Sequence, residues 1–110
     1  MPLDDRSRLR HMLDAAVEAI AFVRGKSRHD LDKDRQLVLA LVKSIELIGE
    51  AATKISADTR HRCPRIPWQD IMSMRHRLIH AYFDVDLNRV WDTIVDDLPP
   101  LIEQLRAAVR

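Results

Sequence analysis

The residues best suited to chemistry gather in one short stretch, MRHRLIHAYFDVD, which spans residues 74–86. Arg75 is permanently charged and can meet a phosphate with two parallel hydrogen bonds, so it suits a group that steadies extra negative charge on phosphorus. His80 titrates near neutral pH and can accept or donate a proton. RNA brings its own nucleophile, the 2′-hydroxyl, so a site with one base and one cation can cleave it without a metal.

The spacing of Arg75 and His80 leaves a second interpretation open. On a straight helix, residues five apart are separated by about 140° around the axis and about 7.5 Å along it. One helix therefore does not bring the two side chains together. Unwinding after Ile79, or pairing with the same stretch of a second subunit, would do so. On spacing alone, the simpler interpretation is an exposed arginine with a histidine at a helix C-terminus, where positive charge is favourable.

Two neighbouring patterns also have competing interpretations. His76 and His80, with Asp84 four residues further on, would share a helical face suited to a transition metal. A fourth ligand has no candidate nearby, so we expect no metal site. Glu46 and Glu50 also lie four residues apart. They could orient a histidine or a basic partner, or they could form a solvated helix face.

Apolar residues at helical spacing predict the elements that position this stretch. We expect helices over about residues 5–24, 33–57, 67–80, 87–98 and 101–110, with a basic loop over residues 56–66. Asp4 or Asp5 can cap the first helix, Gly25 ends it, and Asp86 can cap the fourth. Runs with the alternation of a strand are missing. The prediction is an all-α, up-and-down bundle of four or five helices that forms a single domain over residues 1–110.

The second expected helix carries more apolar surface than a small bundle needs. Its residues form two adjacent strips, which are Leu37, Leu41, Ile48, Ala51 and Ile55, and Val38, Val42, Ile45, Gly49 and Ala52. Such a helix is expected to lie between its own bundle and another surface, and a two-fold homodimer supplies one. Gly49 in mid-helix costs about 1 kcal/mol relative to alanine, and such a glycine often marks close backbone approach.

Charge and composition narrow the function classes. The net charge is +1, but residues 58–80 contain five arginines and two aspartates, and such a basic block could attract a phosphate backbone. The single cysteine excludes an internal disulfide. With neither a signal peptide nor an apolar run near 18 residues, we expect a cytoplasmic protein with no membrane association.

The stretch RHRLIHAY contains Arg75, four residues, His80, one residue and Tyr82, and this pattern resembles the Arg-x4-His-x-Tyr motif of HepT-like toxins. These are small HEPN-domain ribonucleases that are paired with a minimal nucleotidyltransferase antitoxin, MntA. The resemblance extends to FVRGKS, to SIELIGEAATKIS and to PWQDIMSMRHRLIHAYFDVDLNRVWDTIVDDLP, so it spans nearly the whole chain.

The resemblance implies a HEPN-like homodimer whose composite cleft brings Arg75 and His80 of both subunits together. It implies a metal-independent endoribonuclease without a cofactor, acting as the toxin of a toxin-antitoxin system. It also implies that the antitoxin transfers AMP from ATP to Tyr82 and thereby silences the toxin. His76 stands where the family commonly has asparagine, and we assign it a supporting role together with Glu46.

A different class of function remains as the alternative. The chain could be a non-catalytic helical subunit that binds nucleotides or a partner, with the nucleotidyltransferase as the only enzyme of the complex. Modification of Tyr82 in a protein that never degrades RNA would distinguish this alternative from a ribonuclease.

Overall fold

The computed structural model describes residues 1–81 and 84–110, with Leu3, His80 and Ala81 described by their backbone alone. Its helices are α1 (Leu3–Val23), α2 (Asp30–Lys33), α3 (Arg35–Lys54), α4 (Ala57–Arg62), α5 (Trp68–Leu78), α6 (Leu87–Asp92), the π-helical turn η1 (Thr93–Asp97) and α7 (Leu98–Val109). A short antiparallel ribbon pairs β1 (Ile79–Ala81) with β2 (Asp84–Val85). The prediction of an all-α fold is confirmed, and this ribbon is a local addition to it.

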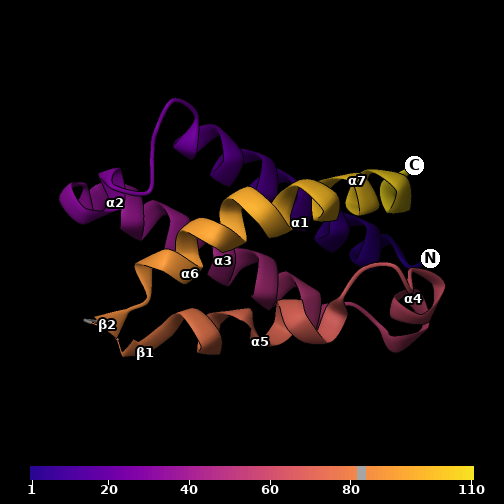
Figure 1. Cartoon of the computed structure of the whole chain (residues 1–110). Helices are drawn as coiled ribbons and strands as arrows, with labels where there is room; N and C mark the ends of the chain where they lie inside the picture. The colour runs from indigo at the N-terminus through magenta and orange to yellow at the C-terminus, as the bar shows by residue number, and fades with distance from the viewer. Residues whose placement is uncertain (82–83) are drawn as a thin grey trace.

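Four rods run up and down in turn, formed by α1, α3, α5 and the continuous α6–η1–α7 (Figure 1). Helix α3 packs against both α1 and α5, and α1 also packs along α7. The two chain termini and α4 lie at one end of the bundle, whereas α2 and the ribbon lie at the other (Figure 1). Within the described residues, no helix combines the length and the apolar character needed to cross a bilayer.

The core explains the two apolar strips of α3 without a second subunit. Leu41, Ile45 and Ile48 are at most 1% exposed, and most other members of both strips are buried as well. Packing of α1 and α5 against α3 therefore supplies the cover that we expected from a partner. The apolar side chains of α3 that remain exposed are Leu39 and Leu47, which belong to neither strip.

Gly49 lies where α3 and α5 approach each other. A Cβ atom at this position would be 3.4 Å from the carbonyl oxygen of Ile71 in α5. The prediction of close backbone approach is confirmed. Gly25 also behaves as predicted, because its φ of 74° lies in the left-handed region that ends a helix without strain only with glycine.

Asp5 does not cap α1, contrary to prediction. The residue before α1 is Pro2, and no side chain caps the helix there. Asp5 is instead 3% exposed, and its carboxylate accepts hydrogen bonds from the Ser56 amide (3.2 Å), the Ser56 hydroxyl (2.6 Å) and the Thr59 hydroxyl (2.6 Å). These bonds tie the start of the chain to the junction of α3 and α4.

The expected loop over residues 56–66 contains helix α4, so that prediction is wrong. Ser56 caps α4 by accepting a hydrogen bond from the Thr59 amide at 3.3 Å, which is a regular N-cap. The sequence lacks an apolar stripe here because the helix is short and buries mainly Thr59. Capping and the bond to Asp5 stabilise this helix in place of a hydrophobic face.

The two prolines near the C-terminus follow a π-helical turn and do not break the helix. Pro99 and Pro100 fall in the first turn of α7, the part of a helix that tolerates proline best. Just before them the chain forms η1, and the Leu98 amide donates to the Thr93 carbonyl, five residues back. The π-helical turn lets α6 and α7 continue as one rod, so the last two predicted helices form a single element.

Candidate active site

Arg75 lies in the last turn of α5 and contacts α3. Its Nε donates to Oε1 of Glu46 at 3.1 Å, and the two side chains are 40% and 23% exposed. Helix α5 presents Arg75 to α3 because Ile71, Met74 and Leu78 anchor the helix in the core. The guanidinium is thus oriented from one side by a carboxylate and remains accessible to a ligand. Glu46 is therefore not part of a purely solvated face.

The helix that carries Arg75 ends before His80. The Ile79 amide donates to the Arg75 carbonyl, and the Asp86 amide donates to the Leu78 carbonyl at 2.8 Å, so the chain turns into the ribbon at this point. The backbone of His80 belongs to β1. The separation of 140° expected on a straight helix therefore does not apply, and unwinding, one of the two solutions expected from the sequence, occurs one residue earlier than supposed.

The motif residues after Ile79 are described only in part. The side chain of His80 and the whole of Tyr82 lie outside the described residues, so the distance between Arg75 and His80 stays a prediction. His76 is exposed on α5, and in the described part of the chain it makes no hydrogen bond or ion pair. Asp84 is exposed on β2, beyond the end of α5, so the helical face proposed for a metal is interrupted.

Asp86 anchors the return of the chain from the ribbon. Its carboxylate accepts from the Arg89 amide at 3.1 Å, which confirms it as the cap of α6, and it pairs with Nε of the same arginine at 3.4 Å. The ribbon is in register at Ile79 with Val85 and at Ala81 with Asp84, with an irregularity between the two pairs. The buried C-terminal end of α5 at Leu78 and the Asp86 cap of α6 therefore hold the two ends of the segment that contains His80.

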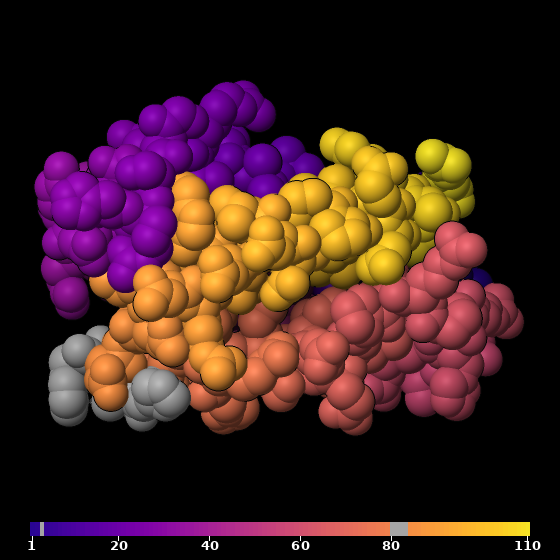
Figure 2. Space-filling model, viewed as in Figure 1, coloured from indigo at the N-terminus to yellow at the C-terminus, as the bar shows by residue number. Residues whose placement is uncertain are grey.

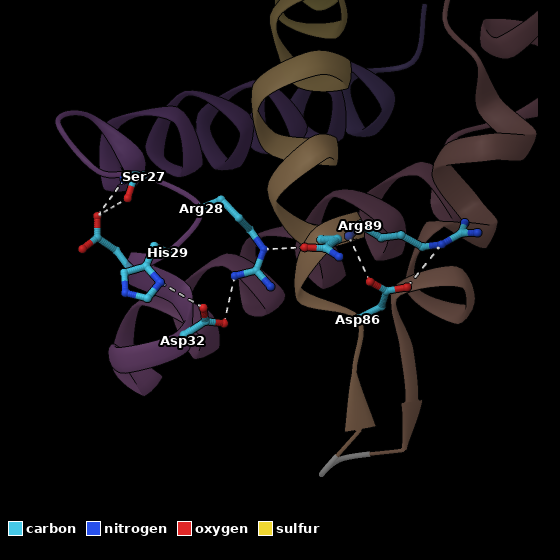
Figure 3. A network of polar contacts seen from close by, with 8 residues as sticks. Ser27, Arg28, His29, Asp32, Asp86 and Arg89 are labelled. Carbon is cyan, nitrogen blue, oxygen red and sulfur yellow. Dashed lines mark hydrogen bonds and ion pairs between the residues drawn. The ribbon is translucent and has the colours of Figure 1, made fainter.

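A second polar network fixes this end of the bundle. Arg28 donates from Nε to the Asn88 side chain at 2.7 Å and from Nη1 to Asp32 at 3.0 Å, so it bridges α2 and α6 (Figure 3). Asp32 also pairs with Nδ1 of His29 at 3.3 Å. The hydrogen bond from Arg28 lowers the pKa of Asp32, with smaller contributions from the charges of Arg28 and His29. Asp32 therefore stays ionised and paired at neutral pH.

Some basic side chains at the ribbon end of the bundle come from a segment outside the basic block. Three arginines of the basic block, Arg60, Arg62 and Arg65, lie on or just after α4, at the opposite end of the bundle from the ribbon (Figure 1). Segment 26–35, which contains α2, lies at the same end of the bundle as the ribbon (Figure 2), and its residues Lys33 and Arg35 line a groove together with Val85 of β2. Lys33 and Arg35 stand at the start of the helix expected over residues 33–57, outside the basic block, and no local signal marked them as part of a site.

The face formed by α5, η1 and α7 is acidic. Two shallow grooves on it share Met74, Arg77 and Asp97 in their linings and also contain Asp70 and Asp92. Burial raises the pKa of Asp97, and the neighbouring charge of Asp96 adds to the effect. Arg77 lines both grooves and Arg89 lines one of them, so the excess of carboxylates is small and the face offers a phosphate backbone no net positive charge.

Comparisons with known proteins agree on one family. The model of the HepT-like ribonucleases, described as "Ribonuclease HepT-like", matches residues 12–108. A Caldanaerobacter subterraneus protein named "Putative RNase TTE0752" is 38% identical over 101 residues, which cover 92% of this chain and 90% of that protein. A Thermococcus cleftensis protein named "Probable ribonuclease HepT" is 37% identical, over 86% of this chain and 92% of that protein. No solved structure matches the chain.

Proposed function

The chain belongs to the HepT-like ribonuclease family, and on that premise we propose that it cleaves RNA internally, without a metal, at a site formed by Arg75 and His80. The observation that supports this assignment most directly is the ion pair of Arg75 with Glu46. It orients a half-exposed guanidinium one turn from the strand that contains His80. Cleavage of a phosphodiester in RNA requires at least a group that stabilises negative charge on the phosphate and a group that transfers a proton, and an oriented arginine and a histidine can serve these two roles.

The chemistry follows from these two side chains. The 2′-hydroxyl oxygen of the RNA forms a bond to the adjacent phosphorus, and the bond from phosphorus to the 5′-oxygen breaks. His80 moves the proton that the 2′-hydroxyl loses or that the leaving 5′-oxygen gains. Arg75 binds the non-bridging oxygens, which carry the most negative charge in the transition state. The products are a 2′,3′-cyclic phosphate and a 5′-hydroxyl.

We place the active site at the interface of a homodimer. Leu39 and Leu47 of α3 are 53% and 43% exposed, and on a helical wheel Glu46 lies about 20° from Leu39. A second copy that covers Leu39 would therefore bring its own Arg75 and His80 close to the first pair. The exposure of Leu39 on the face of α3 that carries Glu46 supports this arrangement, whereas the bundle itself covers the two apolar strips.

In the proposed biological role, the protein is the toxin of a toxin-antitoxin pair. A minimal nucleotidyltransferase would attach AMP to Tyr82, which lies two residues after His80. The added nucleotide would bring bulk and negative charge to the cleft and compete with RNA for it. AMP transfer would therefore inhibit RNA cleavage without a change of fold.

The central experiment compares RNA cleavage by the wild type with cleavage by Arg75→Ala and His80→Ala. Both variants are expected to lose cleavage and growth arrest. Arg77→Ala is the matched control, because Arg77 is an exposed arginine on the same helix whose side chain donates a hydrogen bond to the Asp70 carbonyl and does not pair with Glu46. Equal cleavage by the wild type and both site variants would refute the site at Arg75 and His80, and the absence of cleavage in every form would leave the non-catalytic alternative. EDTA should not change the wild-type rate.

Two further variants test the supporting roles. His76→Ala shifts the pH profile of cleavage if His76 carries a proton, and leaves the profile unchanged if it does not. For the modification, incubation with the partner nucleotidyltransferase, ATP and magnesium should add whole AMP masses in mass spectrometry. A Tyr82→Phe variant that is modified to the same extent would exclude this tyrosine as the acceptor.

A further inference from the structure

A groove lies between α2, the start of α3 and the base of the ribbon. Its volume is about 270 Å³, and its lining consists of Leu31, Asp32, Lys33, Arg35, Val38, Val85 and Leu87. Pockets for complete small molecules start at roughly 300 Å³. The groove is at the small end of this range, and its size suits part of a polymer, such as one base with its ribose.

The groove has an apolar floor and a cationic rim. Leu31 and Val38 are 3% and 8% exposed, and Val85 and Leu87 are half-buried beside them. Lys33 and Arg35 are exposed at the rim, and neither makes a hydrogen bond or a direct ion pair within the described part of the chain. A face that combines apolar contact with exposed, positively charged side chains matches a nucleotide, whose base is flat and whose phosphate is anionic.

The carboxylates of the same segment are already engaged. Asp30 accepts from the Ser27 amide at 2.7 Å, and Asp32 is held by Arg28 at 3.0 Å. Asp34 caps α3 by accepting from the Leu37 amide at 3.0 Å. The guanidinium of Arg28 offsets the charge of Asp32, and Lys26 and Lys33 interact electrostatically with Asp30. The side chains of Lys33 and Arg35 are exposed to solvent. The segment therefore presents a positive rim despite its nearly balanced composition.

The groove is continuous with the strand that contains His80. Val85, which lines the groove, pairs with Ile79, and Ile79 directly precedes His80 on β1. Leu87 begins α6 immediately after the Asp86 cap. An RNA strand with its scissile phosphate at His80 therefore has the groove within reach of its neighbouring nucleotide.

We propose that this groove is a subsite for a nucleotide that flanks the scissile phosphate. Lys33 and Arg35 bind the phosphate of that nucleotide, and the apolar floor receives its base or ribose. The subsite rests on the proposed ribonuclease function, and it extends that function by giving the enzyme affinity for single-stranded RNA on one side of the cleavage point. Arg28 contributes by holding α2 against α6, which keeps the two walls of the groove together.

The test measures RNA binding separately from cleavage. A fluorescein-labelled, single-stranded RNA oligonucleotide of mixed sequence is titrated at several salt concentrations against His80→Ala, with and without Lys33→Ala and Arg35→Ala. Each phosphate that the protein neutralises adds about 0.7 to the magnitude of the slope of log K against log salt for a single strand, and Lys33 and Arg35 bind the same phosphate. The double substitution should therefore lower the magnitude of that slope by about 0.7. In an otherwise wild-type enzyme, the same pair should raise KM and leave kcat nearly unchanged.

The matched control removes two arginines at the other end of the bundle, in Arg62→Ala with Arg65→Ala. Both side chains are exposed, so the control changes net charge equally without touching the groove. An unchanged slope in the groove variant, or the same decrease in both double variants, overturns the subsite. An unchanged slope with weaker binding of the nucleotidyltransferase also overturns it and assigns the groove to a protein partner.

The two proposals can fail separately. If the wild type cleaves RNA and the groove variant binds RNA like its parent, the subsite is wrong and the ribonuclease stands. If no form cleaves RNA but the groove variant alone loses the salt-dependent binding, the groove binds RNA and the catalytic proposal is wrong. Circular dichroism melts of both double variants establish that neither change acts through unfolding.

Discussion

Removal of the carboxylate that orients Arg75 gives the sharpest test of the active-site geometry. Glu46→Ala deletes the acceptor of the hydrogen bond from Arg75 Nε, which is 3.1 Å long. The pair is partly exposed, at 40% and 23%, so its contribution lies near the upper end of the range for exposed ion pairs, at about 1 kcal/mol. For a domain of this size, that loss lowers Tm by about 4–8 °C.

The same free energy sets the expected kinetic effect. If about 1 kcal/mol holds the guanidinium in its working orientation, its loss lowers kcat roughly fivefold, because 1.36 kcal/mol corresponds to tenfold. KM should change little, since Arg75 itself is retained. Glu46→Gln should lie between the wild type and Glu46→Ala, because the amide oxygen still accepts from Nε but the negative charge is gone.

The assay is single-turnover cleavage of a fluorescent RNA, with thermal melts of the same preparations. Glu50→Ala is the control, because Glu50 is an exposed glutamate one turn further along α3 and its side chain makes no hydrogen bond or ion pair with the described residues. A double-mutant cycle over Glu46→Ala and Arg75→Ala should give a coupling of about 1 kcal/mol in stability. Wild-type kcat in Glu46→Ala, or a coupling near zero, would refute the positioning role.

Three other perturbations follow from the fold. Asp5→Ala should cost about 3 kcal/mol at pH 7, because three hydrogen bonds to a buried carboxylate disappear. Hydrogen bonds from Ser56, then Thr59, lower the pKa of Asp5, so the stability that Asp5 contributes is complete above about pH 4 and is lost as the pH falls through the folded-state pKa. Urea unfolding curves of Asp5→Ala and the wild type should therefore converge in acid. A difference in stability that stays constant with pH would contradict this prediction. Gly49→Ala should raise Tm, because alanine improves helix propensity by up to about 1 kcal/mol and its Cβ would lie at an ordinary contact distance of 3.4 Å from the Ile71 carbonyl oxygen. The larger side chain of Gly49→Leu should lower Tm. A lower Tm for Gly49→Ala would show that α3 and α5 cannot shift to admit the methyl group. Arg28→Ala should speed amide hydrogen exchange in α6 but not in α5, and unchanged exchange in α6 would mean that the bond to Asn88 does not hold the helix.

The predictable part of the fold rests on local signals. Apolar spacing located the four long helical segments, Gly25 marked the end of α1, and Asp86 marked the start of α6. Each of these signals acts between residues a few positions apart, so it can be recognised without knowledge of the neighbours in space. The family resemblance, carried by Arg75, His80 and Tyr82, is also a property of the linear sequence.

The errors have a common physical cause. Asp5 looked like a cap because it follows the chain start, yet its hydrogen bonds go to Ser56 and Thr59, 51 and 54 residues away. The second apolar strip of α3 looked unpartnered because the sequence does not show that α5 packs on it. In both cases a distant segment of the same chain satisfied a requirement that local reasoning assigned elsewhere.

The sequence by itself determined the helices, their order and the residues able to do chemistry, since short-range hydrogen bonding and periodic burial depend on neighbouring residues. Only the tertiary structure decided how those residues are used. It paired Arg75 with Glu46 across 29 positions, ended α5 at Leu78 through a hydrogen bond from Asp86, and set Lys33 and Arg35 at a groove lined by Val85. Such contacts depend on how whole helices pack, and packing joins segments whose proximity no local pattern records.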